Sequence, residues 1–201
     1  MIKKFSGYDE IQVFEGGLSI EPGGYELMII AAKVEQTTNY EILKIAFDVI
    51  NHEKYAGIYK KKYEISKSQG YDAKWPGVFD VFIPKDDGSD KDAYTKQAFK
   101  RFITSVERSN ERYTWNWDES TLKGKTFGGL FGREQFVAKN GDVAFVTKIR
   151  AARSIETIRS GEFKIPEDKL LKSSASSNGI PVMAPTSEGF VEIATEEEMP
   201  F

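Results

Sequence analysis

Cysteine is missing from the 201-residue sequence, and His52 is its single histidine. Without thiols the chain can form no disulfide, thiolate metal site or cysteine nucleophile, and one imidazole cannot build a histidine-rich zinc site. Long apolar runs are also missing, because no stretch approaches the roughly 18 residues that a membrane helix needs. These absences exclude most familiar catalytic constellations, and we expect neither a metal nor a cofactor.

The beginning of the chain carries two lysines but no apolar segment. Met1–Phe5 (MIKKF) lacks the apolar core that a secretory signal requires. We therefore expect a cytoplasmic protein that does not act at a membrane.

Charge is unevenly distributed along the chain. The net charge is −3, but residues 171–201 hold five Glu and one Lys, whereas residues 93–170 hold 15 Lys and Arg against 10 Asp and Glu. Residues 1–170 are long enough to bury a core of their own, and the Ser-, Gly- and Pro-rich remainder has no periodic apolar pattern. We expect one folded domain, residues 1–170, followed by a flexible linker and acidic tail, residues 171–201. The basic half of the domain is the expected nucleic-acid face.

The hydrophobic pattern of the folded part indicates five strands. Residues 25–34, 40–50 and 55–65 are rich in β-branched and aromatic residues and predict three antiparallel strands. Residues 124–137 and 143–153 flank an Asn-Gly pair, which is the strongest short-range signal for a hairpin. The stretch between the third strand and the hairpin begins as a polar, irregular segment.

One helix is expected between the third and fourth strands. Apolar residues recur at helical spacing over residues 93–108, with Asp90 or Asp92 available as the N-cap. Three strands, a helix and two strands form the connectivity of the OB-fold, a five-stranded Greek-key barrel that often binds oligonucleotides. The prediction is therefore a mainly β protein with an OB-fold body and a disordered acidic C-terminal tail.

The expected third strand combines cations with aromatic rings. Binding of single strands requires cations along the phosphates and flat rings on which bases stack. In an extended strand Lys60 and Lys62 share one face, while Tyr59 lies on the other. We therefore expect Tyr59, Lys60 and Lys62 to contact DNA, although a solvated strand face without a ligand has the same pattern.

The last strand supplies a second basic face. Alternation directs Val143, Phe145 and Ile149 toward the core and sends Lys148 and Arg150 outward. Lys148 and Arg150 are expected to face the DNA-binding groove.

Tryptophans are the strongest candidates for base stacking. Trp75 stands beside Lys74 in a loop-like segment, where it has little reason to enter the core, so both are expected to contact DNA. Trp115 and Trp117 follow the helix, and alternation exposes one of them if the segment is extended. Packing anchors are the more common use of such rings, and Trp115 is the one that we include in the DNA-binding set.

The last six residues, Glu196–Phe201 (EEEMPF), place an acidic run against an apolar tip. An acidic run alone is common in tails that only aid solubility. The ending resembles the acidic tip of bacterial and bacteriophage single-stranded-DNA-binding proteins, in which acidic residues precede a terminal Pro-Phe and recruit replication and repair partners. The resemblance implies that partner proteins are bound by Glu196, Glu197, Glu198, Met199, Pro200 and Phe201.

Two internal segments carry a second resemblance. Gly124–Glu134 (GKTFGGLFGRE) and Ser154–Pro166 (SIETIRSGEFKIP) look like a family of small replication-module proteins of bacteriophages that infect Gram-positive bacteria. The resemblance spans roughly residues 1–170, contains no catalytic motif, and implies a single-stranded-DNA-binding protein of the host cytoplasm. Within the first segment, Arg133 joins the expected DNA-binding residues.

We therefore expect a protein without enzymatic activity that binds and protects single-stranded DNA during phage DNA replication and recombination. Its tail is expected to recruit replication and recombination proteins. A metal-dependent nuclease of phage recombination and an adaptor that binds no DNA are the alternatives. Whether the chain forms a homo-oligomer stays open.

Overall fold

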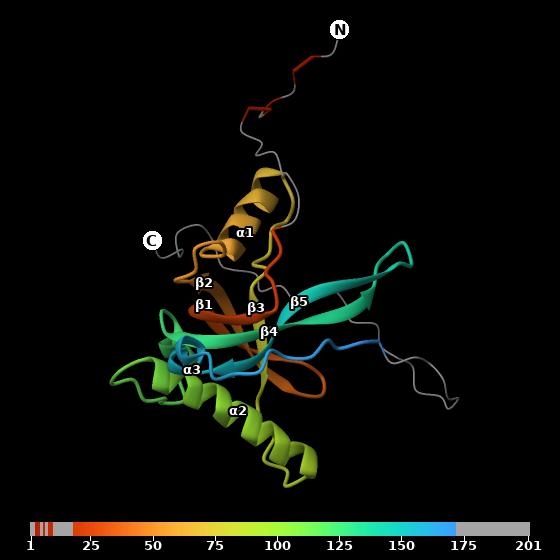
Figure 1. Ribbon diagram of the computed structural model, residues 1–201. Helices are drawn as coiled ribbons and strands as arrows, with labels where there is room; N and C mark the ends of the chain where they lie inside the picture. The colour runs from red at the N-terminus through yellow and green to blue at the C-terminus, as the bar shows by residue number, and fades with distance from the viewer. Residues whose placement is uncertain (1–2, 5, 7, 10–17, 172–201) are drawn as a thin grey trace, which may run out of the picture.

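An antiparallel sheet forms the centre of the computed structural model, which describes residues 3–4, 6, 8–9 and 18–171 (Figure 1). The sheet has five strands in the order β3-β2-β1-β4-β5. The strands are β1 (Gly23–Gln36), β2 (Glu41–Ile50), β3 (Val78–Phe82), β4 (Thr126–Val137) and β5 (Val143–Arg153). The helices are α1 (Ile58–Ser68), α2 (Asp90–Ser109), the 3-10 helix η1 (Glu119–Leu122) and α3 (Ile155–Ser160). The protein is therefore mainly β, and the expected docking peptide Glu196–Phe201 lies outside the described residues.

Four of the expected strands are confirmed. Residues 25–34 and 40–50 lie in β1 and β2, and the two runs around the Asn-Gly pair are β4 and β5. The hairpin closes where the Ala138 N–H donates to the Asp142 carbonyl (2.8 Å). Gly141 has a φ of 87°, which glycine adopts without a steric penalty. The turn chemistry therefore determines this hairpin locally.

The expected strand over residues 55–65 is wrong, because this segment forms helix α1. The Asp48 carboxylate in β2 accepts hydrogen bonds from the backbone N–H groups of Tyr59 (3.0 Å) and Lys60 (3.1 Å). N–H groups in the first turn of a helix have no partner within the helix, so this carboxylate stabilises its beginning. A residue from a distant strand thus favours a helix that local β propensity does not predict.

The third strand lies instead in the segment expected to be irregular. The Phe47 N–H donates to the Gly77 carbonyl (2.8 Å), and β3 continues this pairing along β2 from Val78 opposite Ala46 to Phe82 opposite Ile42. With only five residues, β3 is too short to show a clear alternation in the sequence.

Helix α2 confirms the helix predicted between the third and fourth strands. Its N-cap is Ser89, whose hydroxyl accepts a hydrogen bond from the Asp92 N–H (3.1 Å), so neither Asp90 nor Asp92 is the cap. Phe102 of α2 packs against Phe127 of β4, with 5.6 Å between ring centroids. The apolar side of the helix therefore seals the core.

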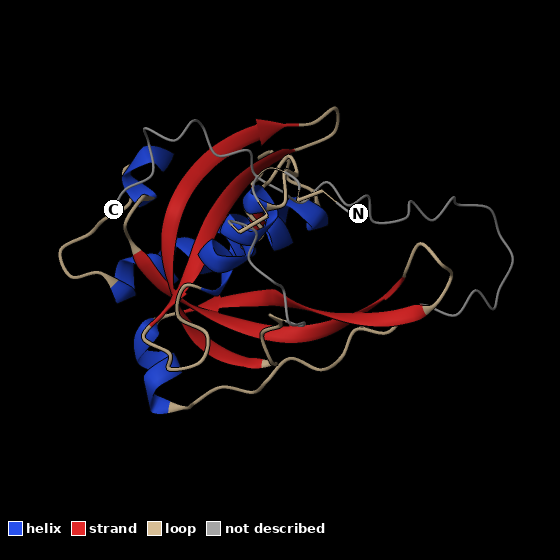
Figure 2. Ribbon diagram, turned by 90° about the horizontal axis from the view of Figure 1, so that it is seen from above, coloured by secondary structure: helices blue, strands red, loops and turns tan. Residues whose placement is uncertain are grey.

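The described sheet is open, so the expected closed barrel is not formed by its strands. β3 and β5 are the two edges and do not pair with each other, although α2 contacts both. The β1–β2 and β4–β5 hairpins diverge from the region in which β1 and β4 pair (Figure 2). Past Phe131, β4 no longer pairs with β1, and its Gln135 N–H donates instead to the Lys169 carbonyl (2.8 Å).

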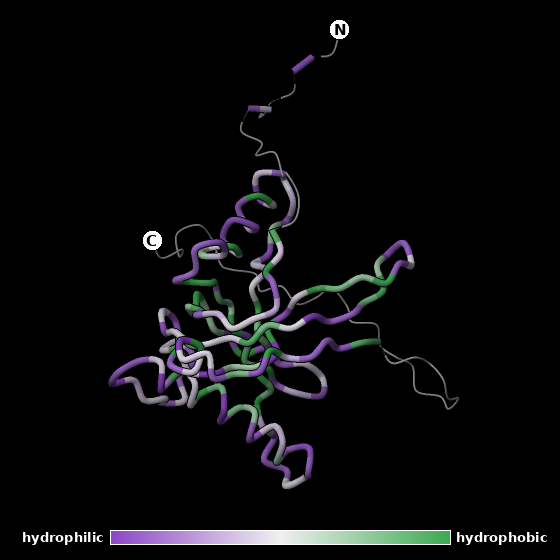
Figure 3. Tube along the Cα trace, viewed as in Figure 1, coloured by the Kyte–Doolittle hydropathy of each residue, from purple (hydrophilic) through white to green (hydrophobic). Residues whose placement is uncertain are grey.

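Hydropathy follows this architecture. Hydrophobic residues concentrate in the central strands, whereas hydrophilic residues occupy the tip of the β4–β5 hairpin (Figure 3). Within the described part of the chain, no helix has the length and apolar character needed to cross a membrane.

Candidate nucleic-acid interface

Helix α2 separates apolar from cationic side chains. Phe99, Phe102, Ile103 and Val106 recur at helical spacing and are buried against the sheet. The remaining positions of the helix include five exposed cations, which are Lys91, Lys96, Lys100, Arg101 and Arg108. The same periodicity that builds the core therefore gathers positive charge on the outer side of α2.

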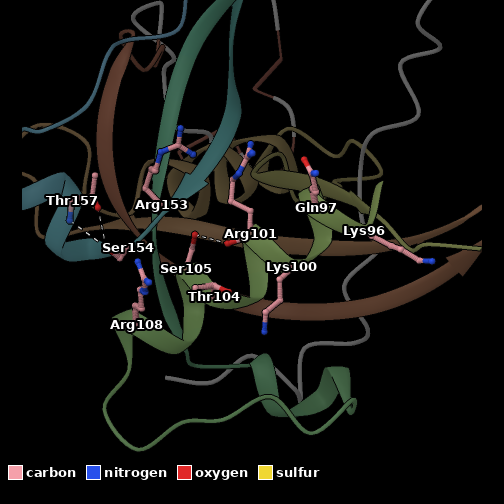
Figure 4. A pocket seen from close by; sticks show the side chains of 10 residues that line it. All are labelled: Lys96, Gln97, Lys100, Arg101, Thr104, Ser105, Arg108, Arg153, Ser154 and Thr157. Carbon is pink, nitrogen blue, oxygen red and sulfur yellow. Dashed lines mark hydrogen bonds between the residues drawn. The ribbon is translucent and has the colours of Figure 1, made fainter. Parts of the chain in front are cut away.

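A cleft of about 700 Å³ runs between this side of α2, the end of β5 and the start of α3 (Figure 4). We call it the basic cleft. It is lined by Lys96, Gln97, Lys100, Arg101, Thr104, Ser105, Arg108, Arg153, Ser154 and Thr157. Five of these residues are cationic and none is acidic, so the cleft is suited to a polyanion.

Hydrogen bonds between elements fix the walls of the basic cleft. Ser154 caps α3, with its hydroxyl accepting from the Thr157 N–H (3.3 Å), and the Ile155 N–H donates to the Ser109 hydroxyl at the end of α2 (3.0 Å). Asn110 joins α2 to β4, because its side chain accepts from the Thr126 N–H (3.0 Å) and donates to the Thr126 carbonyl (2.8 Å). The cations are therefore presented by a preorganised frame.

The cations of the cleft differ in how much of their charge is available. Lys96 pairs with Asp92 (2.9 Å) and Asp86, and these bonds raise the pKa of the lysine. In contrast, Lys100, Arg101 and Arg108 are exposed and have no carboxylate partner among the described residues. These three side chains can exchange water for phosphate oxygens without breaking an internal ion pair.

The basic residues predicted on β4 and β5 do lie together, but carboxylates neutralise them. The Arg133 guanidinium donates to Asp168 (Nε to Oδ1, 3.0 Å). Lys148 and Arg150 both approach Glu134, at 3.6 and 4.0 Å. Their expected outward direction is confirmed, since both residues are exposed, although the Arg150 side chain is more covered than that of Lys148. This cluster of Arg133, Glu134, Lys148, Arg150 and Asp168 is named the hairpin cluster below.

The expected inward positions of the last strand are only partly correct. Ile149 packs against the core, but Val143 and Phe145 are exposed. The reason is that the β4–β5 hairpin extends beyond the part of the sheet that α2 covers (Figure 2). Phe145 instead lies under the guanidinium of Arg133, with 5.1 Å between the charged carbon and the ring centroid.

Trp75 and Tyr59 are core residues, so their expected role in base stacking is contradicted. Trp75 is 2% exposed, and its indole N–H donates to the Phe47 carbonyl (2.9 Å). Tyr59 packs edge-on against Phe47, with 5.3 Å between ring centroids. Trp75 also contacts the ring of Tyr63 on α1, with 5.7 Å between ring centroids, so its ring is covered although Tyr71 and Lys74 in the same loop are exposed.

The neighbouring lysines are not brought to the basic cleft. Lys60 and Lys62 lie on α1, where Lys60 approaches Glu64 (3.9 Å) and the Lys62 ammonium lies 5.6 Å from the Tyr59 ring centroid. Lys74 is exposed beside the buried Trp75. Helices α1 and α2 lie at opposite ends of the sheet (Figure 1), so the lysines on α1 are remote from the basic cleft.

Trp117, rather than Trp115, is the exposed tryptophan of the segment after α2. Trp115 packs against the core, whereas Trp117 is 79% exposed. Alternation along residues 113–118 indicates that one ring is exposed but does not identify which. The cations at 96, 100, 101 and 108 were also missed as a set, although their spacing around the helix is a signal that the sequence contains.

No group of three or more His, Asp or Glu side chains in the described ranges is arranged to hold a metal ion. No protein-family model matches the chain, and no curated protein matches its sequence. The function proposed below therefore rests on the geometry of residues 18–171 and on the sequence of the acidic end of the chain.

Proposed function

We propose that this protein binds single-stranded DNA through the basic cleft, and that it protects the strand during phage DNA replication and recombination. The observation that carries the proposal is the cleft itself, which is lined by five cations, three of them without a carboxylate partner among the described residues. Lys and Arg neutralise phosphates and release the counterions that surround nucleic acids, which supplies most of the sequence-independent affinity. Binding and protection need no catalytic group.

The arrangement of the sheet supports the same proposal. The sheet order β3-β2-β1-β4-β5, with α2 between β3 and β4, is the order expected of an OB-like fold in which β3 and β5 do not pair, and we take it as support. OB-folds bind single strands with a cationic groove and with rings on which bases stack. The interface proposed here lies on the α2 side, where the unpaired cations are, and not on α1 or the hairpin cluster.

The acidic end of the chain adds the second half of the proposed function. Glu196–Phe201 combines carboxylates with an apolar tip and follows a Ser-, Gly- and Pro-rich segment. We assign it to recruitment of replication and recombination proteins, which leaves the folded domain to hold DNA.

Fluorescence anisotropy of a labelled oligo-dT of about 20 nucleotides tests the proposal. The full chain should bind, with an affinity that falls as salt rises by a slope of about 0.7 per phosphate contact. The double variant Arg101→Gln/Arg108→Gln should bind about 10- to 100-fold more weakly and lower the salt slope by about 1.4.

A matched control removes the same amount of charge elsewhere. Lys61→Gln/Lys139→Gln replaces exposed lysines on α1 and on the hairpin turn, and it should retain wild-type affinity. Equal loss in both double variants would contradict the assignment to the basic cleft. Absence of any salt-sensitive affinity in the full chain would favour the adaptor, and magnesium-dependent cleavage of the oligonucleotide would favour the nuclease.

A further inference from the structure

Trp117 is a large apolar side chain that the fold holds in solvent. It is the most exposed of the large hydrophobic residues in the described chain, at 79%. Its backbone φ is 67°, in the left-handed region that a residue with a bulky side chain rarely adopts. Strained backbone of this kind persists only where the surrounding structure imposes it, and it is concentrated at functional sites.

The turn around Trp117 is well supported by hydrogen bonds. The Asp118 N–H donates to Asn116 Oδ1 (3.2 Å), and the Asp118 carboxylate accepts from the Ser120 N–H (3.0 Å) at the start of η1. The Thr121 hydroxyl bonds the Asp118 carbonyl (2.7 Å). The ring is therefore positioned by its turn and not by burial.

The rings of Phe99 and Trp115 lie next to the ring of Trp117. Its ring plane lies within 10° of that of Phe99, with 6.3 Å between centroids, and the ring of Trp115 is also 6.3 Å away. Phe99 is buried on α2, so its ring is held in a fixed position. The exposed ring of Trp117 stacks on the ring of Phe99, and we call this pair of rings the shelf.

The shelf lies beside the basic cleft. Phe99 follows Lys96 by three positions, and residues at this spacing are neighbours on a helix surface. Lys96 and Lys100 both line the cleft. Figure 4 shows Arg101 pointing toward Arg153 and Lys100 pointing to the other side of α2, so the cations of the cleft span the helix.

We propose that Trp117 stacks on an unpaired base of the strand whose phosphates lie in the basic cleft. The proposal rests on the function proposed above and specifies how the site selects single strands. In a duplex the faces of the bases are covered by their neighbours, whereas an unpaired base offers a free face to an aromatic ring. The ligand is thus a single strand, with phosphates bound by cations and one base held by Trp117.

Intrinsic fluorescence combined with anisotropy tests this proposal on the full chain. Of the three tryptophans, Trp75 is buried and Trp115 is partly covered, so oligo-dT should quench mainly Trp117. Trp117→Ala should weaken binding of labelled oligo-dT by about 5- to 150-fold, as expected for the loss of one stacked base. Trp117→Phe should lose the quenching but keep most of the affinity, and binding to a duplex should be the same for all three proteins.

Tyr71→Ala provides the control, since Tyr71 is also exposed, at 68%, but belongs to the loop after α1. It should bind as the wild type does. If the wild type binds oligo-dT and Trp117→Ala binds it equally well, the stacking role is wrong while the basic cleft stands. If the wild type shows no change in anisotropy with any oligonucleotide, the proposed function fails and the stacking role fails with it.

Discussion

The basic cleft and the hairpin cluster are both rich in arginine and lysine, but their cations have different neighbours. In the cleft, Lys100, Arg101 and Arg108 have no carboxylate partner among the described residues. In the hairpin cluster, Glu134 and Asp168 lie between the cations. An ion pair must be broken before its cation can bind a phosphate, so equal numbers of positive residues do not make equal sites. Unpaired charge, and not charge count, locates the candidate interface.

The two regions also differ in how they are held in place. The cleft is framed by hydrogen bonds between elements, such as those of Asn110 with Thr126 and of Ile155 with Ser109. The hairpin projects from the sheet, and ion pairs on its surface connect it to residues 168–169. Surface ion pairs contribute little to stability, whereas hydrogen bonds of partly buried groups are costly to lose.

The largest effect is expected from Asn110→Ala, which breaks the frame of the cleft. The substitution removes four hydrogen bonds, one to the Val106 carbonyl and three with the backbone N–H, the backbone carbonyl and the hydroxyl of Thr126. Unsatisfied polar groups should lower the free energy of unfolding by about 1–3 kcal/mol, measured by urea denaturation. Asn116→Ala, in an exposed turn, should cost less, and the reverse order would contradict this account of the frame.

A smaller effect should follow from releasing the cations of the hairpin cluster. Glu134→Gln/Asp168→Asn removes the carboxylates that neutralise Arg133, Lys148 and Arg150. The affinity for oligo-dT should then rise by about three- to tenfold, with a steeper salt dependence, because new cations become available to phosphate. Unchanged affinity in the anisotropy titration would show that pairing is not what separates the two regions.

The smallest effect concerns the pH dependence of the hairpin cluster. Partial burial acts to raise the pKa of Glu134, but the bond to Lys169 and the charges of Lys148 and Arg150 outweigh it and lower the pKa. Stability from this carboxylate is therefore complete above its ordinary pKa of 4.5 and is lost as the pH falls through the lowered value. The contribution should be below about 1 kcal/mol, as for other solvent-accessible pairs.

Thermal melts of the wild type and Glu134→Gln measure this contribution. The wild type should melt higher at neutral pH, and the difference should vanish below the lowered pKa. A difference that persists in acid would mean that Glu134 stabilises the hairpin in its protonated form.

Much of the fold follows from local patterns. The helical spacing of Phe99, Phe102 and Val106 predicts α2, and the Asn-Gly pair predicts the β4–β5 hairpin, because both signals act between residues close in the chain. The same holds for β1 and β2, whose runs of β-branched and aromatic residues are long enough to be unambiguous. The acidic character of Glu196–Phe201 and the lack of cysteine are likewise read directly from the sequence.

Other features depend on residues that are distant in sequence. Helix α1 forms where local propensity predicts a strand, because Asp48 of β2 bonds its first N–H groups. Trp75 enters the core because the Phe47 carbonyl accepts its indole N–H. No pattern within residues 55–77 carries this information. The predicted strand over residues 55–65 and the predicted base stacking by Tyr59 and Trp75 are therefore wrong.

The properties of the candidate site also divide into those that the sequence determines and those that depend on the tertiary structure. By itself, the sequence determined that residues 93–170 carry excess positive charge, and it indicated that one of Trp115 and Trp117 is exposed if the segment after α2 is extended. Only the tertiary structure decided which cations face their own carboxylates, as Arg133 faces Asp168, and which have no carboxylate partner among the described residues, as is the case for Arg101 and Arg108. The physical reason is that charge is a property of each residue, whereas the availability of that charge depends on which distant side chains the fold brings within contact.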